Sequence, residues 1–392
     1  MKIAFYTTSF FPYLCGVTTA IWSLCRGLSK QGHEVVICIP KAKSPILARV
    51  REEGIKIVFL PAFQQRIYKD KNRKAGVPSA KSFLQIKKIN PDIIHFHTPD
   101  LVGLEAILTA RILKKPLIGS FHTYFMSPEY QRILRLGKTG EDLIEKILWK
   151  YNNSVYNRCD LVITPSVYAK WDLQKNGLKK PVEIVSYPVD LSSLTKTSAS
   201  KKARLKKRFN LNNKTVLYVG RLSREKSLDL LILAFNLVVR QLRLAKLLLV
   251  GDGPAKGELK ELVLALGLEK NIIFAGKMDY AELFESGVYE LATLFATAST
   301  SEVQPMSILE AMAFGLPIVG VKARGVPEMI RGNGIICPPG NIRKMSKAII
   351  KILKDQSLHT RLAKKSRELI EKEHAIDKVT RRLEEVYLKV KR

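Results

Sequence analysis

Two glutamates, Glu302 and Glu310, combine a residue type and a spacing that suit the two ends of one polar ligand. Pro305, between them, is placed for the first turn of a helix that would contain Glu310. Residues eight apart on an ideal helix lie about 12 Å from each other, comparable to the span from a hexose to the ribose of a nucleotide sugar. The free N–H groups of Met306 and Ser307 would form an anion site between those ends. The alternative is that Glu302 caps the helix and Glu310 lies on the surface.

Two cations, Arg221 and Lys226, follow Gly220 in a loop between a predicted strand and a predicted helix. In open α/β sheets ligands bind at the carboxyl ends of the strands, where two cations can clamp a diphosphate. A solvated loop is the alternative. Gly251 and Gly253 form a second glycine cluster after a strand, and with Gly220 we predict that they bind the same ligand. They lack the G-x-G-x-x-G spacing of a dinucleotide-binding helix, which argues against a dehydrogenase.

Three histidines follow or end predicted strands. His122 comes just after the strand at residues 116–120, which places it at the edge of a cleft, although a core or loop histidine would fit equally well. His95 and His97 end another strand, but the sequence suggests no third ligand nearby. We therefore expect no metal site.

The elements that position these residues alternate between strand and helix, which indicates βαβ units and parallel sheets. The predicted strands are residues 2–6, 34–39, 55–60, 93–96, 116–120, 182–185, 216–219, 245–250, 272–274, 294–296 and 317–321. The predicted helices include residues 18–30, 101–113, 227–239 and 378–391.

A Ser/Thr/Lys-rich stretch that ends at Arg208 separates two such series and marks the domain boundary. We predict an α/β protein of two Rossmann-like parallel-sheet domains, residues 1–190 and 191–375. A C-terminal helix, about residues 376–392, would return to the first domain.

Composition narrows the class of protein. The 66 Lys and Arg residues exceed the 35 Asp and Glu residues, giving a formal charge of +31 that favours nucleic acid, anionic lipid or phosphate ligands as partners. No run approaches the roughly 20 apolar residues of a membrane-spanning helix, and the amino terminus fits a buried strand better than a signal peptide. The five cysteines are scattered, which disfavours a disulfide framework or a structural zinc site. We expect a cytoplasmic protein.

Several of these motifs together resemble one family. The segments at residues 220–226, 299–317 and 325–328, with weaker matches at Gly16-Val17 and residues 32–35, resemble retaining glycosyltransferases of family 4, which have the GT-B fold. The resemblance covers essentially the whole chain. It implies two Rossmann-like domains facing a central cleft and a UDP-sugar donor, with no metal or other cofactor required.

The resemblance also implies roles for the site residues. Glu302 would contact the donor sugar, Glu310 would hold the ribose hydroxyls, and Arg221 and Lys226 would neutralise the diphosphate. The Gly16 amide would approach the phosphate from the first domain. His122 would contact the donor sugar and shape the acceptor site. The acceptor hydroxyl would attack from the front face while the leaving phosphate helps to take its proton.

Departures from the family pattern indicate a subgroup. Where many members have Gly-Phe-Gly, this chain has Val303-Gln304-Pro305, and the Glu-x-Gln pattern resembles enzymes that glycosylate diacylglycerol. The segment Phe121-His122-Thr123-Tyr124 resembles them too, while Tyr187-Pro188 replaces the usual Asn-Gly. This implies transfer of a hexose, expected to be glucose, to a lipid acceptor, expected to be 1,2-diacylglycerol.

A membrane surface follows as an expected partner. Between residues 124 and 138, apolar and basic side chains are interspersed, as in segments that lie among lipid headgroups. The expected contact residues are Tyr124, Phe125, Arg132, Arg135 and Lys138. A core helix is the alternative for this segment. We expect peripheral attachment to the inner face of the cell membrane.

Three alternatives stay open. A family member could act on a polysaccharide or another sugar, and a phosphorylase would share the fold. A nucleic-acid-binding protein would need basic residues interleaved with aromatic ones or a recognised module, and neither stands out. We therefore expect no nucleic-acid partner.

Overall fold

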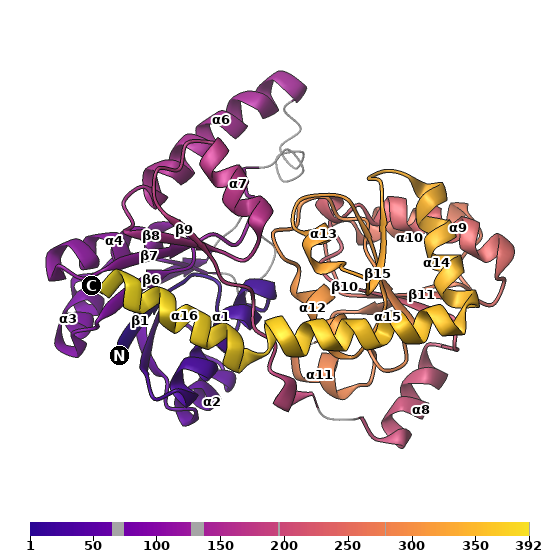
Figure 1. The fold of residues 1–392 in the computed structure, drawn as a ribbon, viewed down its shortest axis with the longest axis horizontal. Coiled ribbons are helices and arrows are strands. Elements are labelled where there is room, and N and C mark those ends of the chain that lie inside the picture. The colour runs from indigo at the N-terminus through magenta and orange to yellow at the C-terminus, as the bar shows by residue number, and fades with distance from the viewer. Residues whose placement is uncertain (65–73, 127–136, 195–196, 279, 392) are drawn as a thin grey trace. The chain divides into compact units, whose positions relative to one another are not determined.

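The structure is a computed structural model that describes residues 1–64, 74–126, 137–194, 197–278 and 280–391 (Figure 1). The chain divides into two compact units. Unit 1 comprises Met1–Pro188 and Ala375–Arg392, and unit 2 comprises Val189–His374. These limits lie within two residues of the expected domain limits at 190 and 376.

Unit 1 contains a seven-stranded sheet in the order β3-β2-β1-β6-β7-β8-β9, in which every neighbouring pair is parallel. Its strands are β1 (Lys2–Tyr6), β2 (Glu34–Pro40), β3 (Lys56–Leu60), β6 (Ile93–Phe96), β7 (Leu117–Ser120), β8 (Leu161–Thr164) and β9 (Val182–Ile184). A short antiparallel pair, β4 (Ala62–Gln64) and β5 (Lys74–Gly76), forms a separate two-stranded sheet. The chain reverses its winding between β1 and β6, where Phe5 is level with His95.

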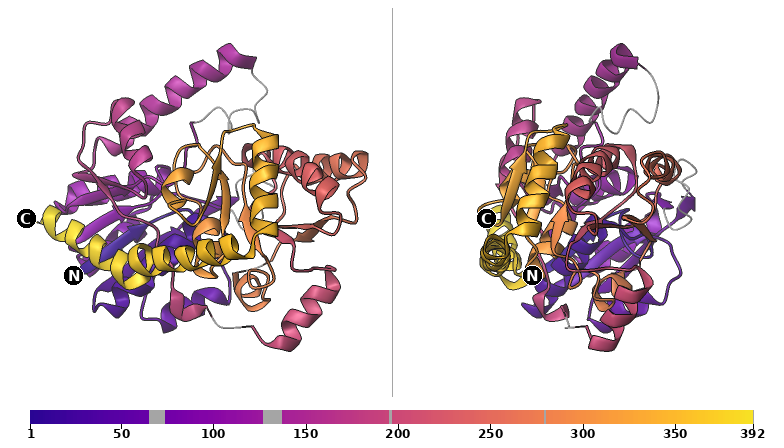
Figure 2. Two further views of the ribbon diagram at one scale, coloured as in Figure 1. Left: turned by 45° about the vertical axis from the view of Figure 1, so that its right-hand side comes forward. Right: turned by 90° about the vertical axis from the view of Figure 1, so that its right-hand side faces the viewer.

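Helices cover the strands of unit 1. They are α1 (Gly16–Lys30), α2 (Ile46–Glu52), α3 (Ala80–Ile89), α4 (Leu101–Leu113), α6 (Gly137–Tyr156), α7 (Val167–Lys175) and α16 (Ile376–Lys391). The long helix α6 stands out from the rest of unit 1 in every view (Figures 1 and 2). Within the described ranges, no helix has both the length and the apolar character needed to cross a bilayer.

The C-terminal helix α16 packs on α1, which confirms the expected return to the first domain (Figure 1). Gln31 Nε2 donates to Thr380 Oγ1 at 2.7 Å. A Cβ at Gly27 would lie 2.4 Å from Thr380 Cγ2, so glycine is needed for this close approach. Leu383 and Tyr387 are fully enclosed in the core that β1 and α1 build.

Unit 2 contains a six-stranded parallel sheet in the order β12-β11-β10-β13-β14-β15. Its strands are β10 (Thr215–Val219), β11 (Lys246–Val250), β12 (Ile272–Gly276), β13 (Leu294–Ala296), β14 (Ile318–Val321) and β15 (Gly334–Cys337). β10, β11, β13 and β14 are buried throughout, as expected for strands covered on both faces. The winding reverses between β10 and β13, and ligands bind at such a switch point in open sheets.

The helices of unit 2 complete the Rossmann-like arrangement. They are η2 (Leu191–Ser193), α8 (Ala199–Arg208), η3 (Arg224–Lys226), α9 (Leu228–Gln241), α10 (Lys256–Ala265), α11 (Tyr280–Glu285), α12 (Met306–Ala313), α13 (Val326–Met329), α14 (Ile342–Lys354), α15 (Gln356–Leu369) and the π-helical turn η4 (Ile370–His374). The basic stretch that we predicted as a domain boundary is helix α8. Ser198 caps it by accepting from the Lys201 amide, so this stretch is part of unit 2.

Candidate functional site

The loops that follow β10 and β13 meet at the switch point of the unit 2 sheet. The Ser299 and Ser301 hydroxyls, after β13, donate to the Glu225 carbonyl, after β10, at 3.5 and 3.2 Å. Ser227, the N-cap residue of α9, has a left-handed backbone with φ 50°. These contacts fix the two loops that carry the predicted cations and Glu302.

Lys226 and Glu302 form an ion pair across this switch point. Lys226 Nζ lies 2.7 Å from Glu302 Oε1, and the two side chains are only 17% and 16% exposed. A partly shielded pair is stronger than one on the open surface. The structure therefore brings together two residues, 76 positions apart, that the sequence predicts for one ligand.

The two arginines of the β10 loop differ. Arg221 is exposed, and its carbonyl accepts from the Tyr218 hydroxyl at 3.2 Å. Arg224 is also exposed, and its guanidinium makes two hydrogen bonds to Glu258, at 3.1 and 2.6 Å. Arg224 is thus engaged by α10, while Arg221 shares its loop with the Lys226–Glu302 pair.

Gly251 and Gly253 let the β11 loop approach the β10 loop. Gly251 has φ 140°, and a Cβ there would lie 1.9 Å from the Gly220 carbonyl oxygen. A Cβ at Gly253 would lie 2.3 Å from the Leu222 carbonyl oxygen. Packing alone is enough to require glycine at these two positions. Donor contacts by their backbone stay a prediction.

Helix α12 begins directly after the β13 loop. Pro305 is its N-cap residue, with φ −71° and ψ 120°, one position before the first turn in which we expected it. The cap has no side-chain hydrogen bond, and the Glu302 carboxylate is bound to Lys226 instead. The first amides of the helix, those of Met306 and Ser307, precede any intrahelical acceptor and can bind an anion.

Glu310 lies inside α12 and is buried, with 6% of its surface exposed. Its Oε2 accepts from the Tyr289 hydroxyl at 2.6 Å. Burial raises the pKa of the Glu310 carboxyl to about 7, although the Tyr289 hydrogen bond opposes this rise. Tyr289 stacks on Phe314 with ring centroids 5.0 Å apart. The alternatives of a capping Glu302 and a surface Glu310 are therefore wrong.

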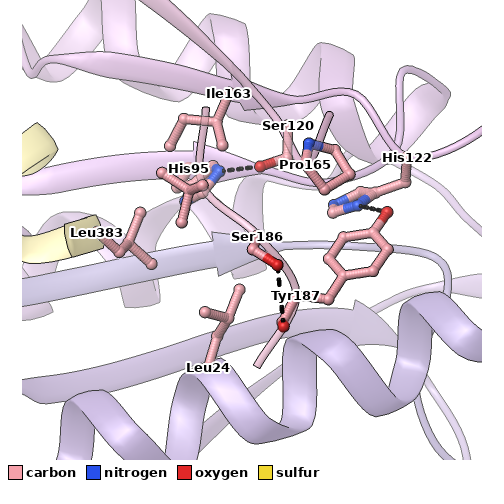
Figure 3. Close-up of a pocket in the computed structure, with 10 residues that line it drawn as sticks. Leu24, His95, Ser120, His122, Ile163, Pro165, Ser186, Tyr187 and Leu383 are labelled. Carbon is pink, nitrogen blue, oxygen red and sulfur yellow. Dashed lines mark hydrogen bonds between the residues drawn. The ribbon is translucent and has the colours of Figure 1, made fainter. Parts of the chain in front are cut away.

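Unit 1 has its own group of polar side chains at the carboxyl ends of β6 and β7. His122 Nε2 lies 2.9 Å from His97 Nδ1, and His122 Nδ1 lies 2.7 Å from the Tyr187 hydroxyl (Figure 3). His95 bonds Ser120 Oγ at 2.7 Å (Figure 3) and Tyr387 Oη at 2.8 Å. A small pocket lies beside His95, His122 and Tyr187. We name these six side chains the histidine cluster: His95, His97, Ser120, His122, Tyr187 and Tyr387.

The rings of the histidine cluster are neutral at pH 7. Burial lowers the pKa of His122 to about 3 and holds the pKa values of His95 and His97 well below 6.5. Both ring nitrogens of His122 are bonded to protein groups. In this arrangement, contact between His122 and a sugar would use its backbone or the carbon edge of its ring.

The histidine cluster brings His122 next to His97, a proximity that the sequence did not suggest. The His97 and His122 rings lie nearly parallel, with an angle of 17° between their planes and centroids 5.2 Å apart, and share a hydrogen bond between ring nitrogens. Across the parts of the chain that the structure describes, no group of three or more His, Cys, Asp or Glu side chains is arranged to hold a metal ion.

The remaining predicted residues belong to unit 1. Gly16 is the exposed first residue of α1 and follows the N-cap Cys15, so its amide is in the first turn of a helix. Tyr124 differs from expectation. Its side chain is 1% exposed and packs edge-on against Phe121, with ring centroids 5.2 Å apart. The ring is therefore part of the core of unit 1 and does not face a membrane. Phe125 is half-buried.

The other expected membrane residues cannot be placed. Arg132 and Arg135 lie outside the described residues, as does the side chain of Lys138 at the start of α6.

Sequence reasoning missed Tyr187, Tyr289 and Tyr387, which bond His122, Glu310 and His95. No motif surrounds Tyr289 or Tyr387. Tyr187 had one signal, because it stands where related sequences have Asn-Gly.

The two Rossmann-like units, with a polar site at the switch point of the second, define a GT-B glycosyltransferase fold. Residues 15–193 match the family "Glycosyltransferase Family 4", and residues 200–369 match "Glycosyl transferases group 1". The alpha-monoglucosyldiacylglycerol synthase of Streptococcus pneumoniae is 31% identical over 334 residues, which are 84% of this chain and 72% of that protein. The chain therefore belongs to glycosyltransferase family 4.

Other relatives differ in their named activities. The alpha-monoglucosyldiacylglycerol synthase of Acholeplasma laidlawii is 24% identical, over 81% of this chain and 80% of that protein. A GDP-mannose-dependent alpha-mannosyltransferase of Corynebacterium glutamicum is 26% identical, over 92% of this chain and 83% of that protein. The structure of Anabaena HepE with UDP-glucose has a TM-score of 0.77 at 20% identity, over 99% of this chain and 100% of HepE, and shows the shared fold.

Proposed function

We propose that this chain is a retaining glycosyltransferase that moves a hexose, expected to be glucose, from a UDP-sugar to a lipid acceptor, expected to be 1,2-diacylglycerol. The observation that carries the proposal is the shielded Lys226–Glu302 pair beside the first turn of α12. The pair supplies a cation and a carboxylate, and the first turn of α12 supplies free amides, all at the switch point of one sheet. These are the groups that a nucleoside diphosphate sugar requires.

Each part of the donor has a proposed partner. Lys226 and Arg221, with the first amides of α12, would stabilise the charge that develops on the leaving diphosphate. Glu302 would accept from a sugar hydroxyl with the carboxylate oxygen that Lys226 does not hold. Glu310, deeper in α12, would accept from the ribose hydroxyls. The Gly16 amide would contribute a further donor to the phosphate.

Retention is proposed through front-face attack. A double displacement needs a carboxylate nucleophile at the anomeric carbon. Of the two predicted carboxylates, Glu302 is held by Lys226 at 2.7 Å and Glu310 is buried against Tyr289. Neither is presented as a nucleophile. This supports a mechanism in which the leaving phosphate assists the acceptor proton.

The lipid acceptor is supported by the activities named for the pneumococcal and Acholeplasma relatives. It is tested by incubating the chain with radiolabelled UDP-glucose, UDP-galactose or GDP-mannose and vesicles that contain 1,2-diacylglycerol. We expect label from UDP-glucose in the lipid phase, and an α-linkage by NMR. A β-linked product would overturn retention, and label in a soluble glycoside alone would favour a polysaccharide or other sugar acceptor.

A phosphorylase is the further alternative within this fold. It would release glucose 1-phosphate from a polysaccharide when phosphate is added, without any UDP-sugar. We expect no such release. Its detection at a rate above that of transfer would replace the proposed function.

We further propose peripheral attachment to the cytoplasmic face of an anionic membrane. The net charge of +31 supports it, since each basic residue near an anionic surface adds about 1 kcal/mol at most. Sedimentation should show binding that rises with the anionic lipid fraction and falls with salt, because salt screens surface charge. Equal binding to neutral and anionic vesicles would contradict it. Stable retention of RNA at physiological salt, without sugar transfer, would instead favour a nucleic-acid partner.

A further inference from the structure

Both ring nitrogens of His122 are hydrogen-bonded, so His122 connects Tyr187 and His97 within unit 1. The Tyr187 hydroxyl lies at one end, 2.7 Å from His122 Nδ1, and His97 lies at the other, 2.9 Å from His122 Nε2. Tyr187 is 5% exposed and His97 is 1% exposed. Tyr187 also stands next to Pro188, the last residue of the first of the two segments that form unit 1.

Only two proton arrangements satisfy both hydrogen bonds when the rings are neutral. If Tyr187 donates to His122 Nδ1, then His122 Nε2–H donates to His97 Nδ1, and His97 carries its own proton on Nε2. If His122 Nδ1–H donates to Tyr187, then His97 Nδ1–H donates to His122 Nε2, and His97 Nε2 is bare. The proton position on both rings therefore changes together.

His97 Nε2 distinguishes the two arrangements. It is buried and has no hydrogen-bond partner among the described residues. A buried N–H group without an acceptor is the rarer and costlier case in folded proteins. The second arrangement, in which His97 Nε2 carries no proton and His122 Nδ1–H donates to Tyr187, is therefore favoured.

We infer that Tyr187 is a positioning residue that accepts a hydrogen bond from His122 Nδ1–H and thereby sets the tautomer and orientation of the His122 and His97 rings. His122 is held on both sides, so the backbone at residues 121–123 is held with it. As far as turnover is concerned, the inference rests on the proposed function, in which His122 lies at the sugar and acceptor end of the site.

The cluster supplies a matched control. Tyr387 bonds His95 Nδ1 at 2.8 Å, as Tyr187 bonds His122 Nδ1 at 2.7 Å. Tyr187→Phe and Tyr387→Phe each remove one hydroxyl from one histidine of the same cluster. Only the first substitution touches His122.

The test is NMR of the full chain with ¹⁵N-labelled histidine, which reports the tautomer of each ring without any substrate. In the unmodified chain we expect both His122 and His97 to be protonated on Nδ1. Tyr187→Phe removes the acceptor, so the protons should move to Nε2 on both rings. Tyr387→Phe should leave the tautomers of His122 and His97 unchanged.

Kinetics supply the second readout. Tyr187→Phe should lower kcat about tenfold, because a displaced site backbone loses alignment with the reacting atoms, while KM for the UDP-sugar stays within about twofold. An Nε2–H tautomer of His122 in the unmodified chain would overturn the inference, and so would an unchanged tautomer in Tyr187→Phe. If transfer is absent with every donor, the proposed function fails, and the NMR result still decides the role of Tyr187.

Discussion

The two sheets present opposite chemistry at their carboxyl edges. At the edge of unit 2, Lys226 and Glu302 are charged and paired at 2.7 Å, and Arg221, in the same loop as Lys226, is exposed. At the edge of unit 1, His122 and its neighbours are neutral and bonded to tyrosine and serine hydroxyls. The same Rossmann-like architecture thus supports a charged site in one unit and an uncharged one in the other.

This difference fits the proposed function, in which the two units bind different parts of the reactants. A diphosphate leaving group needs compensating charge, which Lys226 and Arg221 at the unit 2 edge can supply. A sugar ring and an acceptor hydroxyl are uncharged, and a rigid neutral cluster can orient them without attracting counterions. If this is so, charge and buried acidity should matter most in unit 2, whereas hydrogen-bond geometry should matter in unit 1, where Tyr187→Phe tests it.

The largest effect on sugar transfer is expected from Arg221, the exposed cation that we predict for the unit 2 site. Arg221→Ala should reduce transfer by a hundredfold to a thousandfold with the fold intact, or about 3–4 kcal/mol of transition-state stabilisation. Steady-state transfer from UDP-glucose measures it. Arg224→Ala is the matched control, since this arginine is exposed in the same loop but is bound to Glu258. It should keep transfer within about twofold. Equal losses in both variants would remove Arg221 from the site.

The second prediction concerns stability and pH at Glu310. Its pKa is raised from 4.5 to about 7 by burial, so folding favours the protonated carboxyl. The stabilisation is present below pH 4.5 and is lost as the pH rises to about 7, by about 3 kcal/mol at most. Glu310→Gln keeps an acceptor for Tyr289 but cannot ionise. Its free energy of unfolding relative to the parent chain should therefore rise between pH 5 and pH 8 in denaturant titrations.

The lowered pKa values of the histidines in unit 1 change the free energy of unfolding with pH in the opposite direction. The pKa of His122 is lowered from 6.5 to about 3, so its stabilisation is present above pH 6.5 and is lost as the pH falls toward 3. Glu310→Gln should leave this loss of stability at low pH unchanged. A pH profile of the variant that is parallel to that of the parent chain from pH 5 to pH 8 would contradict the pKa assigned to Glu310.

The third prediction separates the two glutamates of unit 2. Glu310→Ala should weaken UDP binding about tenfold, or about 1.4 kcal/mol, because a hydrogen-bond acceptor for the ribose is lost. Glu302→Ala should bind UDP within about twofold and lower turnover instead, since UDP carries no sugar for it to contact. Calorimetry with UDP alone measures both affinities. If Glu310→Ala binds UDP as tightly as the parent chain, its assignment to the ribose is wrong.

Much of this site could be predicted from local sequence. The strands that precede Arg221 and Glu302 have short apolar runs, and the chain folds them at residues 215–219 and 294–296, close to the predicted limits. Glu302 and Lys226 are recognisable because their loops carry motifs. Parallel strands then bring the two loops together at one edge, and strand order follows from general rules of connection.

The partners of these residues could not be predicted in the same way. Tyr289 reaches Glu310 from 21 positions away, and Tyr387 reaches His95 from 292 positions away. Such pairs depend on how helices pack, which no local pattern encodes. Tyr124 shows the same limit, because its apolar and basic surroundings fit a membrane segment, whereas its ring is buried against Phe121.

The smallest effect is expected from removing divalent metal ions. In the proposed reaction the positive charge comes from Arg221, Lys226 and the first amides of α12, so the leaving diphosphate needs no bound cation. Transfer in excess EDTA should therefore stay within about twofold of transfer in Mg²⁺ or Mn²⁺, whereas Arg221→Ala should keep its loss of about a hundredfold or more with either ion. A loss in EDTA that Mg²⁺ or Mn²⁺ restores would show that side-chain cations alone do not provide the charge. Rescue of Arg221→Ala by millimolar Mg²⁺ would place a metal ion in the role assigned here to that arginine.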